Sequence, residues 1–143
     1  MTEQPEISFR PIEDGDVDAV ISLWERCGLT RPWNEPLRDV EFARGEKNSD
    51  ILVGEINGEL IASVMVGHDG HRGVVYYLSV EPDLQGKGLG HQVMRKAEDW
   101  LKERGVWKLN LMMRAENARV RAFYESLGYE VEERLNMARR LLD

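Results

Sequence analysis

Residues 74–94 read VVYYLSVEPDLQGKGLGHQVM and pass from a strand pattern to a helix pattern across a glycine-rich loop. The first seven residues are apolar at nearly every position, which is typical of a strand that is buried on both faces and central in a sheet. Pro82 ends this strand, and a helical period begins at Gly88. Because glycine costs backbone entropy when it is ordered, the alternation of Gly86, Gly88 and Gly90 indicates a structural or ligand requirement.

The glycine loop is expected to bind an anion. It joins the carboxyl end of a strand to the start of a helix, where backbone N–H groups and the helix dipole attract negative charge. A dinucleotide fingerprint fails because His91 stands where its last glycine is required. A Walker A motif fails because Gly88 follows the Gly86–Lys87 pair. The loop therefore predicts a diphosphate site, with Lys87 as a local cation, that is not built for a nucleoside triphosphate.

Periodicity places the other elements in the order β-α-α-β-β-β-α-β-α-β, followed by an uncertain segment. The expected strands are residues 7–12, 50–56, 59–67, 74–80, 106–113 and 129–134. The expected helices are residues 13–28, a weaker one at 35–44 with Leu37, Val40 and Phe42 as its apolar set, 88–104 and 117–128. The dipeptides Asn57-Gly58 and Asp69-Gly70 predict hairpins. The result is an α/β or α+β layered domain with a mixed sheet, in which the strands at 74–80 and 106–113 run parallel.

Composition limits the class of protein. The 143 residues suit one domain, residues 1–143, and the net charge of -7 argues against a nucleic-acid partner. One cysteine and three histidines predict neither a disulfide framework nor a metal site. The N-terminal sequence MTEQPEISFR is no secretory signal, and no apolar run approaches the ~20 residues that span a bilayer. A soluble cytoplasmic protein without membrane association is therefore expected.

Two blocks of the sequence resemble the signatures of the GCN5-related N-acetyltransferase (GNAT) family. Residues 78–94 resemble its strand, its Arg/Gln-x-x-Gly-x-Gly/Ala loop and the following helix, with Gln85 where arginine is most often found. Residues 117–129, NARVRAFYESLGY, resemble its second block. The pair in this order is much more specific than either block alone. Within the family, residues 23–34 and 68–73 resemble the small bacterial YpeA-type proteins.

The resemblance implies a fold and an activity. The fold is a mixed sheet that splays at its central strand, with helices on both faces and acetyl-CoA in the opening. Residues 135–142, which propensity alone favours as a helix, become a last strand. The activity is acetyl-CoA-dependent transfer of an acetyl group to a primary amine by direct attack on the thioester, without a metal. A catalytically silent acyl-CoA-binding module is the alternative. The expected acceptor is a small-molecule amine or a protein N-terminus, and a homodimer fits the family.

The same resemblance implies the site residues on the donor side. Tyr124 is the expected catalytic acid that protonates the CoA thiolate, although a core aromatic beside Phe123 is the structural alternative. Leu78 and Val80 would act through backbone N–H groups. The full set of expected cofactor-binding residues is Leu78, Val80, Gln85, Gly86, Lys87, Gly88, Leu89, Gly90 and Asn117. Asn117 is also a natural helix N-cap.

The acceptor side and the general base are less constrained. The first helix, its following loop and the second hairpin are expected to face the acceptor, with Trp33, Asn34 and Tyr76 as lining residues. Arg31 and Trp24 are further candidates, although Trp24 lies on an apolar helix face, which favours the core. The general base is left open among Glu55, Asp69, His71, Glu81 and a chain of water molecules.

Overall fold

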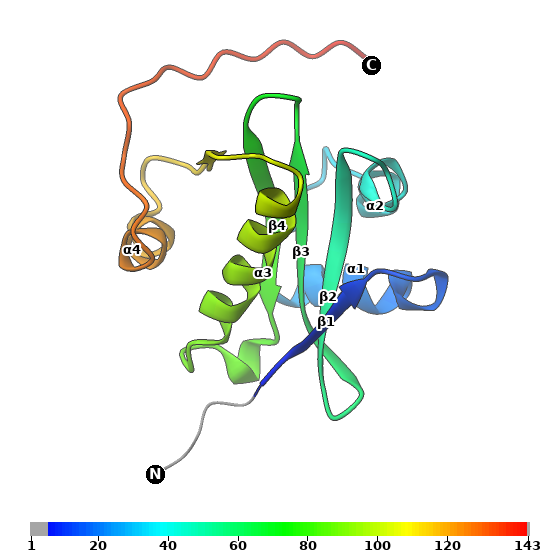
Figure 1. Cartoon of the computed structure of the whole chain (residues 1–143). Coiled ribbons are helices and arrows are strands. Elements are labelled where there is room, and N and C mark those ends of the chain that lie inside the picture. The colour runs from blue at the N-terminus through cyan, green and yellow to red at the C-terminus, as the bar shows by residue number, and fades with distance from the viewer. Residues whose placement is uncertain (1–5, 143) are drawn as a thin grey trace. The chain divides into compact units, whose positions relative to one another are not determined.

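The computed structural model describes residues 6–142 of the chain (Figure 1). They form two compact units, one ending at Leu111 and one beginning at Met112. The strands of the first unit are β1 (Ser8–Pro11), β2 (Ser49–Ile56), β3 (Glu59–His68), β4 (Gly73–Val80) and β5 (Leu109–Asn110). Its helices are α1 (Val17–Arg26), α2 (Pro36–Ala43) and α3 (Leu89–Glu103), with 3-10 turns η1 (Asp14–Asp16) and η2 (Pro82–Leu84). The second unit contains α4 (Ala118–Ser126). The single domain expected for residues 1–143 stays a prediction.

The strands lie in the sheet in chain order, from β1 to β5. The pairs from β1 to β4 are antiparallel, and β4 runs parallel to β5, as expected for strands joined through α3. Asn57 and Gly58 both have positive φ, 52° and 79°, which is the type I′ geometry that the dipeptide predicts. The second hairpin is confirmed as well: the Asp69 carboxylate accepts the backbone N–H groups of His71 and Arg72 at 2.8 Å each.

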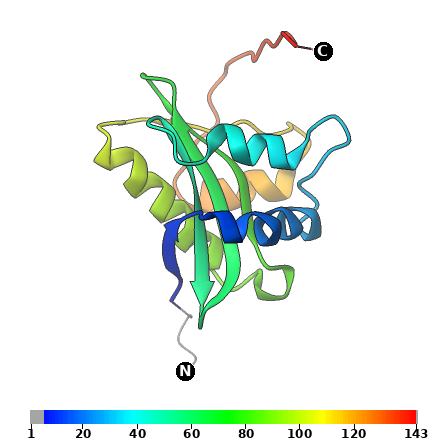
Figure 2. The same ribbon diagram turned by 90° about the vertical axis from the view of Figure 1, so that its right-hand side faces the viewer.

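Helices cover both faces of this sheet. Helices α1 and α2 lie on one face and α3 lies on the other, as Figures 1 and 2 show from two directions. On the first face, Val20, Trp24 and Val40 from the helices are buried with Ile51 and Val53 of β2. On the second face, α3 buries the stripe that its sequence period predicts: Leu89, Val93, Ala97, Trp100 and Leu101. The mixed sheet with helices on both faces is therefore confirmed.

Two expectations about burial are wrong. β4 lies inside the sheet between β3 and β5, but it is not buried on both faces along its whole length, since Tyr76 is 44% exposed. In α2, Val40 and Ala43 form the buried stripe, and Leu37 and Phe42 are 55% and 86% exposed. Val40 and Ala43 are three residues apart and therefore share one face of α2.

The end of the chain contains less regular structure than expected. The strand predicted at residues 106–113 is reduced to Leu109–Asn110. Of the residues that the structure describes, those from 129 to 142 form neither strand nor helix, so the strands predicted at 129–134 and 135–142 are wrong. Alternating apolar residues make a strand only when a neighbouring strand supplies ladder hydrogen bonds. Residues 129–142 do not join the described sheet, and Leu135 and Met137 are exposed.

Within residues 6–142, the helices are all too short or too polar to cross a membrane.

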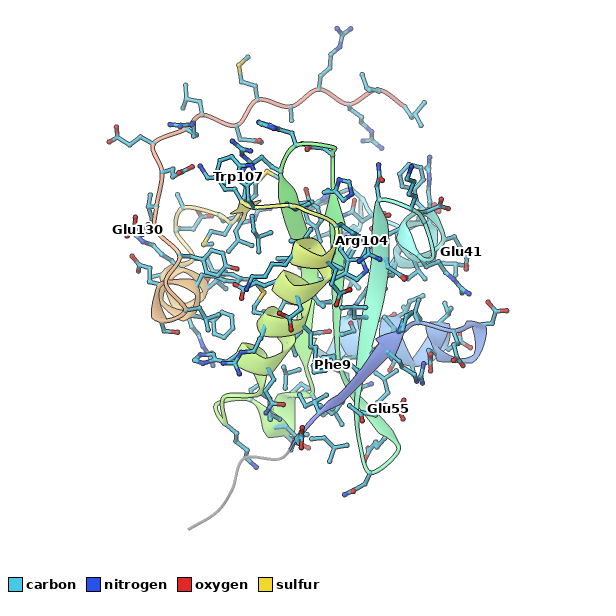
Figure 3. All side chains as sticks on the ribbon, in the orientation of Figure 1. Phe9, Glu41, Glu55, Arg104, Trp107 and Glu130 are labelled. Atoms are coloured by element: carbon cyan, nitrogen blue, oxygen red, sulfur yellow. The ribbon has the colours of Figure 1, made fainter. Side chains whose placement is uncertain are left out.

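The close packing of β1 against β2 leads to a prediction about Gly54. A Cβ atom there would lie 2.6 Å from Cγ2 of Ile7 and 3.1 Å from Cε1 of Phe9, which projects from β1 in Figure 3. Since Ile7 is buried and β-branched, its methyl group cannot move away freely. Gly54→Ala should therefore destabilise the fold by about 1–3 kcal/mol in urea unfolding. Gly15→Ala is the matched control, because nothing lies within 4 Å of its Cβ position. Equal midpoints for the two variants would contradict the packing described for β1.

Candidate functional site

Strand β4 loses its second neighbour partway along its length. The parallel ladder pairs Gly73 with Leu109 and Val74 with Asn110, and it continues no further among the described residues. On its other side, β4 pairs with β3 as far as Val80, opposite Ala62. Residues 75–80 therefore have a ladder partner on one side only. This opening is the splay that the fold class predicts.

A β-bulge interrupts β4 inside the opening. Tyr76 pairs with Met65 and Ser79 pairs with Ser63, so that Tyr77 and Leu78 together lie opposite a single residue of β3. Tyr77 has φ = 54°, a left-handed conformation that costs a non-glycine residue on the order of 1–3 kcal/mol. Such a conformation persists only where the surroundings enforce it, so the bulge marks a candidate functional position.

The bulge also changes which face the side chains occupy. Met65 packs against the core under α1 and α2, so its cross-strand partner Tyr76 points to that face too. Tyr77 stacks on Trp24 of α1 and therefore shares the same face. A bulge breaks the alternation of a strand, so that two consecutive side chains lie on the same face. Both tyrosines thus point toward the side of the sheet that carries α1 and α2.

The backbone beyond the bulge turns its polar groups toward the opening. The Glu81 N–H donates to the Ile61 carbonyl at 2.7 Å, so Glu81 faces β3. Alternation then directs the N–H and C=O groups of Val80 and Leu78 away from β3. The Val80 carbonyl accepts the Cys27 thiol at 3.2 Å and the Gln85 amide at 2.9 Å. The N–H groups of Leu78 and Val80 lie on the same side, where they can donate to a carbonyl oxygen or to an extended chain.

The glycine loop leads directly from this strand into α3. Gly86 and Gly88 have φ of 79° and 80°, so the left-handed backbone explains two of the three glycines. Gly88 is the N-cap of α3, and no described side chain caps this helix end. No acidic residue lies in the first turn of α3. A Cβ on Gly86 would meet nothing within 4 Å, so the loop is open at that position. These features together are those of an anion site at a helix N-terminus.

Side chains at the end of α1 form hydrogen bonds with the residues that lead from β4 into the glycine loop. The Arg26 guanidinium makes two hydrogen bonds to the Glu81 carboxylate, at 3.1 and 2.6 Å. Burial raises the pKa of the Cys27 thiol, which keeps it a donor to Val80. The Gln85 amide is directed to the Val80 carbonyl, so its side chain shapes the end of β4. A direct contact of Gln85 with a cofactor stays a prediction.

The candidate general bases differ in their surroundings. Glu81 is paired with Arg26, and Glu55 accepts the Arg10 Nε at 2.7 Å. Backbone hydrogen bonds from Arg72 and His71 lower the pKa of Asp69, which holds it as a turn-forming carboxylate. These contacts leave the three carboxylates with structural partners. The identity of the base stays open.

The expected acceptor residues lie in the loop between α1 and α2 and on β4. Trp33 is 61% exposed and Asn34 is also exposed, and Tyr76 is described above. Arg31 donates to the carbonyls of Gly28 and Thr30, so its guanidinium holds its own loop. Trp24 is completely buried, which confirms the core alternative for that residue.

The second unit contains the remaining predicted site residues. The Asn117 side chain caps α4 by accepting the Val120 N–H at 3.2 Å. Tyr124 is buried and contacts the rings of Phe123 and Tyr129 edge-on, with centroids 5.0 and 5.7 Å away. Burial raises the pKa of Tyr124 to about 12. The phenol is therefore protonated at neutral pH and can act as a donor.

A mixed sheet that opens beside a bulged strand, followed by a glycine-lined and uncapped helix N-terminus, is the arrangement that the resemblance to acetyltransferases predicts. The model of the Acetyltransferase (GNAT) family matches residues 17–129. The chain is 42% identical over 137 residues to an acetyltransferase from Pectobacterium atrosepticum, covering 96% of this chain and 97% of that protein. The chain therefore belongs to the GNAT family and is an N-acetyltransferase.

Solved structures agree on the fold. The ribosomal-protein-S18-alanine N-acetyltransferase from Escherichia coli is similar with a TM-score of 0.72 and 26% identity, over 86% of this chain and 77% of that one. The structure of AAC(6')-Iy with the bisubstrate analogue CoA-S-monomethyl-acetylneamine has a TM-score of 0.80 at 16% identity, over 96% of this chain and 99% of that one.

Proposed function

We propose that this chain transfers the acetyl group of acetyl-CoA to a primary amine, which attacks the thioester directly. The observation that carries the proposal is the bulge at Tyr77, which turns the backbone of Leu78 and Val80 toward the open edge of the sheet. The anion site at the start of α3 follows a few residues later on the same chain. The CoA-based analogue in the structure of AAC(6')-Iy supports the choice of donor.

The donor is proposed to bind along β4 and the glycine loop. Its diphosphate accepts hydrogen bonds from backbone N–H groups of residues 86–90 at the start of α3, and Lys87 adds a positive charge nearby. The Asn117 side chain is proposed as a further contact. The residues proposed for donor binding are Leu78, Val80, Gln85, Gly86, Lys87, Gly88, Leu89, Gly90 and Asn117. Because the chain has a net charge of -7, local dipoles rather than overall charge must attract this anion.

The reaction requires that β4 stabilise an oxyanion and that an acid protonate the leaving thiolate. The neutral amine forms a C–N bond to the thioester carbon, and negative charge develops on the carbonyl oxygen. The N–H groups of Leu78 and Val80 are proposed to stabilise that oxyanion, with roughly 3 kcal/mol for each well-aimed donor. The C–S bond then breaks, and the thiolate must gain a proton as the new amide loses one.

Tyr124 is proposed to pass that proton to the leaving sulfur. A phenol with a pKa of about 12 is protonated throughout the neutral range. Complete transfer from it to a thiolate of ordinary pKa, ~8.5, is uphill, so the phenol must recover a proton quickly. The N-protonated product of the amine attack is acidic enough to supply it. The net change is one proton moved from the amine to the CoA thiolate.

The acceptor is proposed to bind on the α1 and α2 side of the sheet. Trp33, Asn34 and Tyr76 are the residues proposed to line this site, and the bulge places Tyr76 on that face. A small-molecule amine and a protein N-terminus are both acceptor classes among the similar structures, by the names of AAC(6')-Iy with its acetylneamine analogue and of the S18-alanine enzyme. A homodimer stays a prediction.

A thiol-release assay tests the proposed function. Acetyl-CoA is incubated with the protein and a panel of amines that includes amino sugars, polyamines and peptides with a free N-terminal alanine. We expect amine-dependent release of CoA from at least one acceptor. Acetyl-CoA should also raise the melting temperature, whereas ATP and NAD should not. A thermal shift without thiol release for any amine would instead indicate an acyl-CoA-binding module.

Gly88→Glu should abolish donor binding, since it places negative charge and a side chain at the N-cap of α3. We expect the rise in melting temperature with acetyl-CoA to disappear and the dissociation constant to increase roughly tenfold or more. Gly105→Glu is the matched control, because Gly105 has a similar φ of 81° and an open Cβ position at the other end of α3. If both variants bind acetyl-CoA equally well, the diphosphate lies elsewhere.

Tyr124→Phe should lower kcat by about 100-fold while KM for acetyl-CoA changes little, because only the acid is lost.

The pH dependence of the transfer rate tests the protonation state of Tyr124. The rate should rise with pH as the amine loses its proton. A phenol with the ordinary pKa near 10 would make the rate fall again there, but the pKa of Tyr124 is raised to about 12. We therefore expect no descending limb up to pH 10. A descending limb at pH 9–10 that disappears in Tyr124→Phe would contradict the raised pKa.

A further inference from the structure

The left-handed residue of the bulge is held from two helices. The Tyr77 ring stacks on the buried Trp24 ring of α1, with 3.9 Å between centroids and 5° between planes. Its hydroxyl donates to the Asp39 carboxylate of α2 at 2.6 Å. Burial, together with this hydrogen bond, raises the pKa of Tyr77, so the phenol stays a donor. The ring of Tyr77 is thus fixed by its face and by its tip.

A buried polar chain holds the first residue pair after the bulge. The Trp24 indole Nε1 donates to the Ser63 hydroxyl at 2.8 Å, and the Ser63 and Ser79 hydroxyls are 2.9 Å apart. Among the described residues, Ser63 and Ser79 are the only buried polar side chains, and they form the cross-strand pair next to Tyr77. A fully satisfied buried network specifies one arrangement, because any other leaves a polar group without a partner.

These contacts converge on the strand segment that the proposed function needs. Trp24 reaches the bulge through both Tyr77 and Ser63, and Asp39 reaches it through Tyr77 alone. The bulge in turn sets the direction of the Leu78 and Val80 N–H groups. No described hydrogen bond of Asp39 or Ser63 serves the glycine loop, so their effect on the reaction would pass through the shape of β4.

We propose that Asp39, Ser63 and Trp24 are positioning residues for acetyl transfer: they hold Tyr77 in its left-handed conformation and so aim the Leu78 and Val80 N–H groups at the thioester oxygen. This inference rests on the proposed function. It adds a requirement on side chains that lie outside both family signatures. We expect their loss to lower the rate of transfer more than the affinity for the donor, since the proposed diphosphate site at the start of α3 is left unchanged.

Kinetics of matched variants test the hydroxyl contact of Tyr77. Asp39→Ala should lower kcat about tenfold and leave KM for acetyl-CoA within about twofold. Asp39→Asn keeps an oxygen acceptor for the Tyr77 hydroxyl and should restore kcat to within about threefold of the wild type. Tyr77→Phe keeps the stacked ring and loses the same hydrogen bond. It should therefore match Asp39→Ala, and the double variant should be no slower than either single one.

The buried chain is tested in the same way. Ser63→Ala leaves the Trp24 indole without its acceptor and should lower kcat by a similar factor. Ser49→Ala is the control: its hydroxyl donates to the backbone carbonyl of Ala43 at 2.8 Å, and Ser49 pairs with Gly67 of β3 rather than with a residue near the bulge. We expect its kcat to be unchanged. Melting temperatures of all variants show whether each is folded at the assay temperature.

A measurement without turnover separates this inference from the proposed function. In ¹H–¹⁵N spectra, the Leu78 and Val80 amide signals should shift in Asp39→Ala and return toward wild-type positions in Asp39→Asn. If the wild type releases no thiol with any amine, the proposed function fails, and these shifts still decide whether the bulge depends on Asp39. Unmoved amide signals in Asp39→Ala together with wild-type kcat would overturn the inference, because the bulge would then be held by packing alone.

Discussion

The left-handed turn of the backbone at Tyr77 is the constraint on which the site depends. A regular β4 would alternate from Gly73 to Val80 and would present Tyr76 and Tyr77 on opposite faces. The extra residue instead places both on the α1 and α2 side and leaves Leu78 and Val80 facing the open edge. The short β5 keeps that edge accessible, since its ladder ends at Val74. The opening and the bulge are therefore needed together. The opening leaves the edge of β4 accessible, and the bulge directs the backbone groups of Leu78 and Val80 toward that edge.

The two substrates of the proposed reaction meet different kinds of groups on this strand. The donor is proposed to meet backbone N–H groups, at Leu78 and Val80 and at the start of α3. The proposed donor side therefore depends on the backbone conformation of β4 and on glycine at two left-handed positions. The acceptor side is proposed to be lined by side chains, and of these Trp33 and Tyr76 are exposed. Side chains can vary without disturbing the fold, which lets one architecture serve different amines.

This difference explains what the sequence could predict. The α3 stripe, the Asn57-Gly58 turn, the parallel crossover and the left-handed glycines follow from local rules, and the structure agrees with them. The bulge was missed because VVYYLSV contains no glycine, and a left-handed tyrosine is enforced by Trp24 and Asp39, far away in the sequence. The strands predicted at 129–134 and 135–142 failed for a related reason: alternation indicates a possible strand, but pairing requires a partner that periodicity does not identify.

The hydrogen bond between Tyr77 and Asp39 could couple binding of the acceptor to binding of the donor. Asp39 lies on α2, and the loop that carries Trp33 and Asn34 leads directly into that helix. An acceptor that bound this loop and shifted α2 would change the hydrogen bond to Tyr77, and through it the direction of the Leu78 N–H. Coupling of this kind is reciprocal, so a donor carbonyl seated on the strand would equally favour one position of α2. If the acceptor binds this loop as proposed, the positioning contacts would give a physical route by which it affects the rate of transfer as well as its own binding.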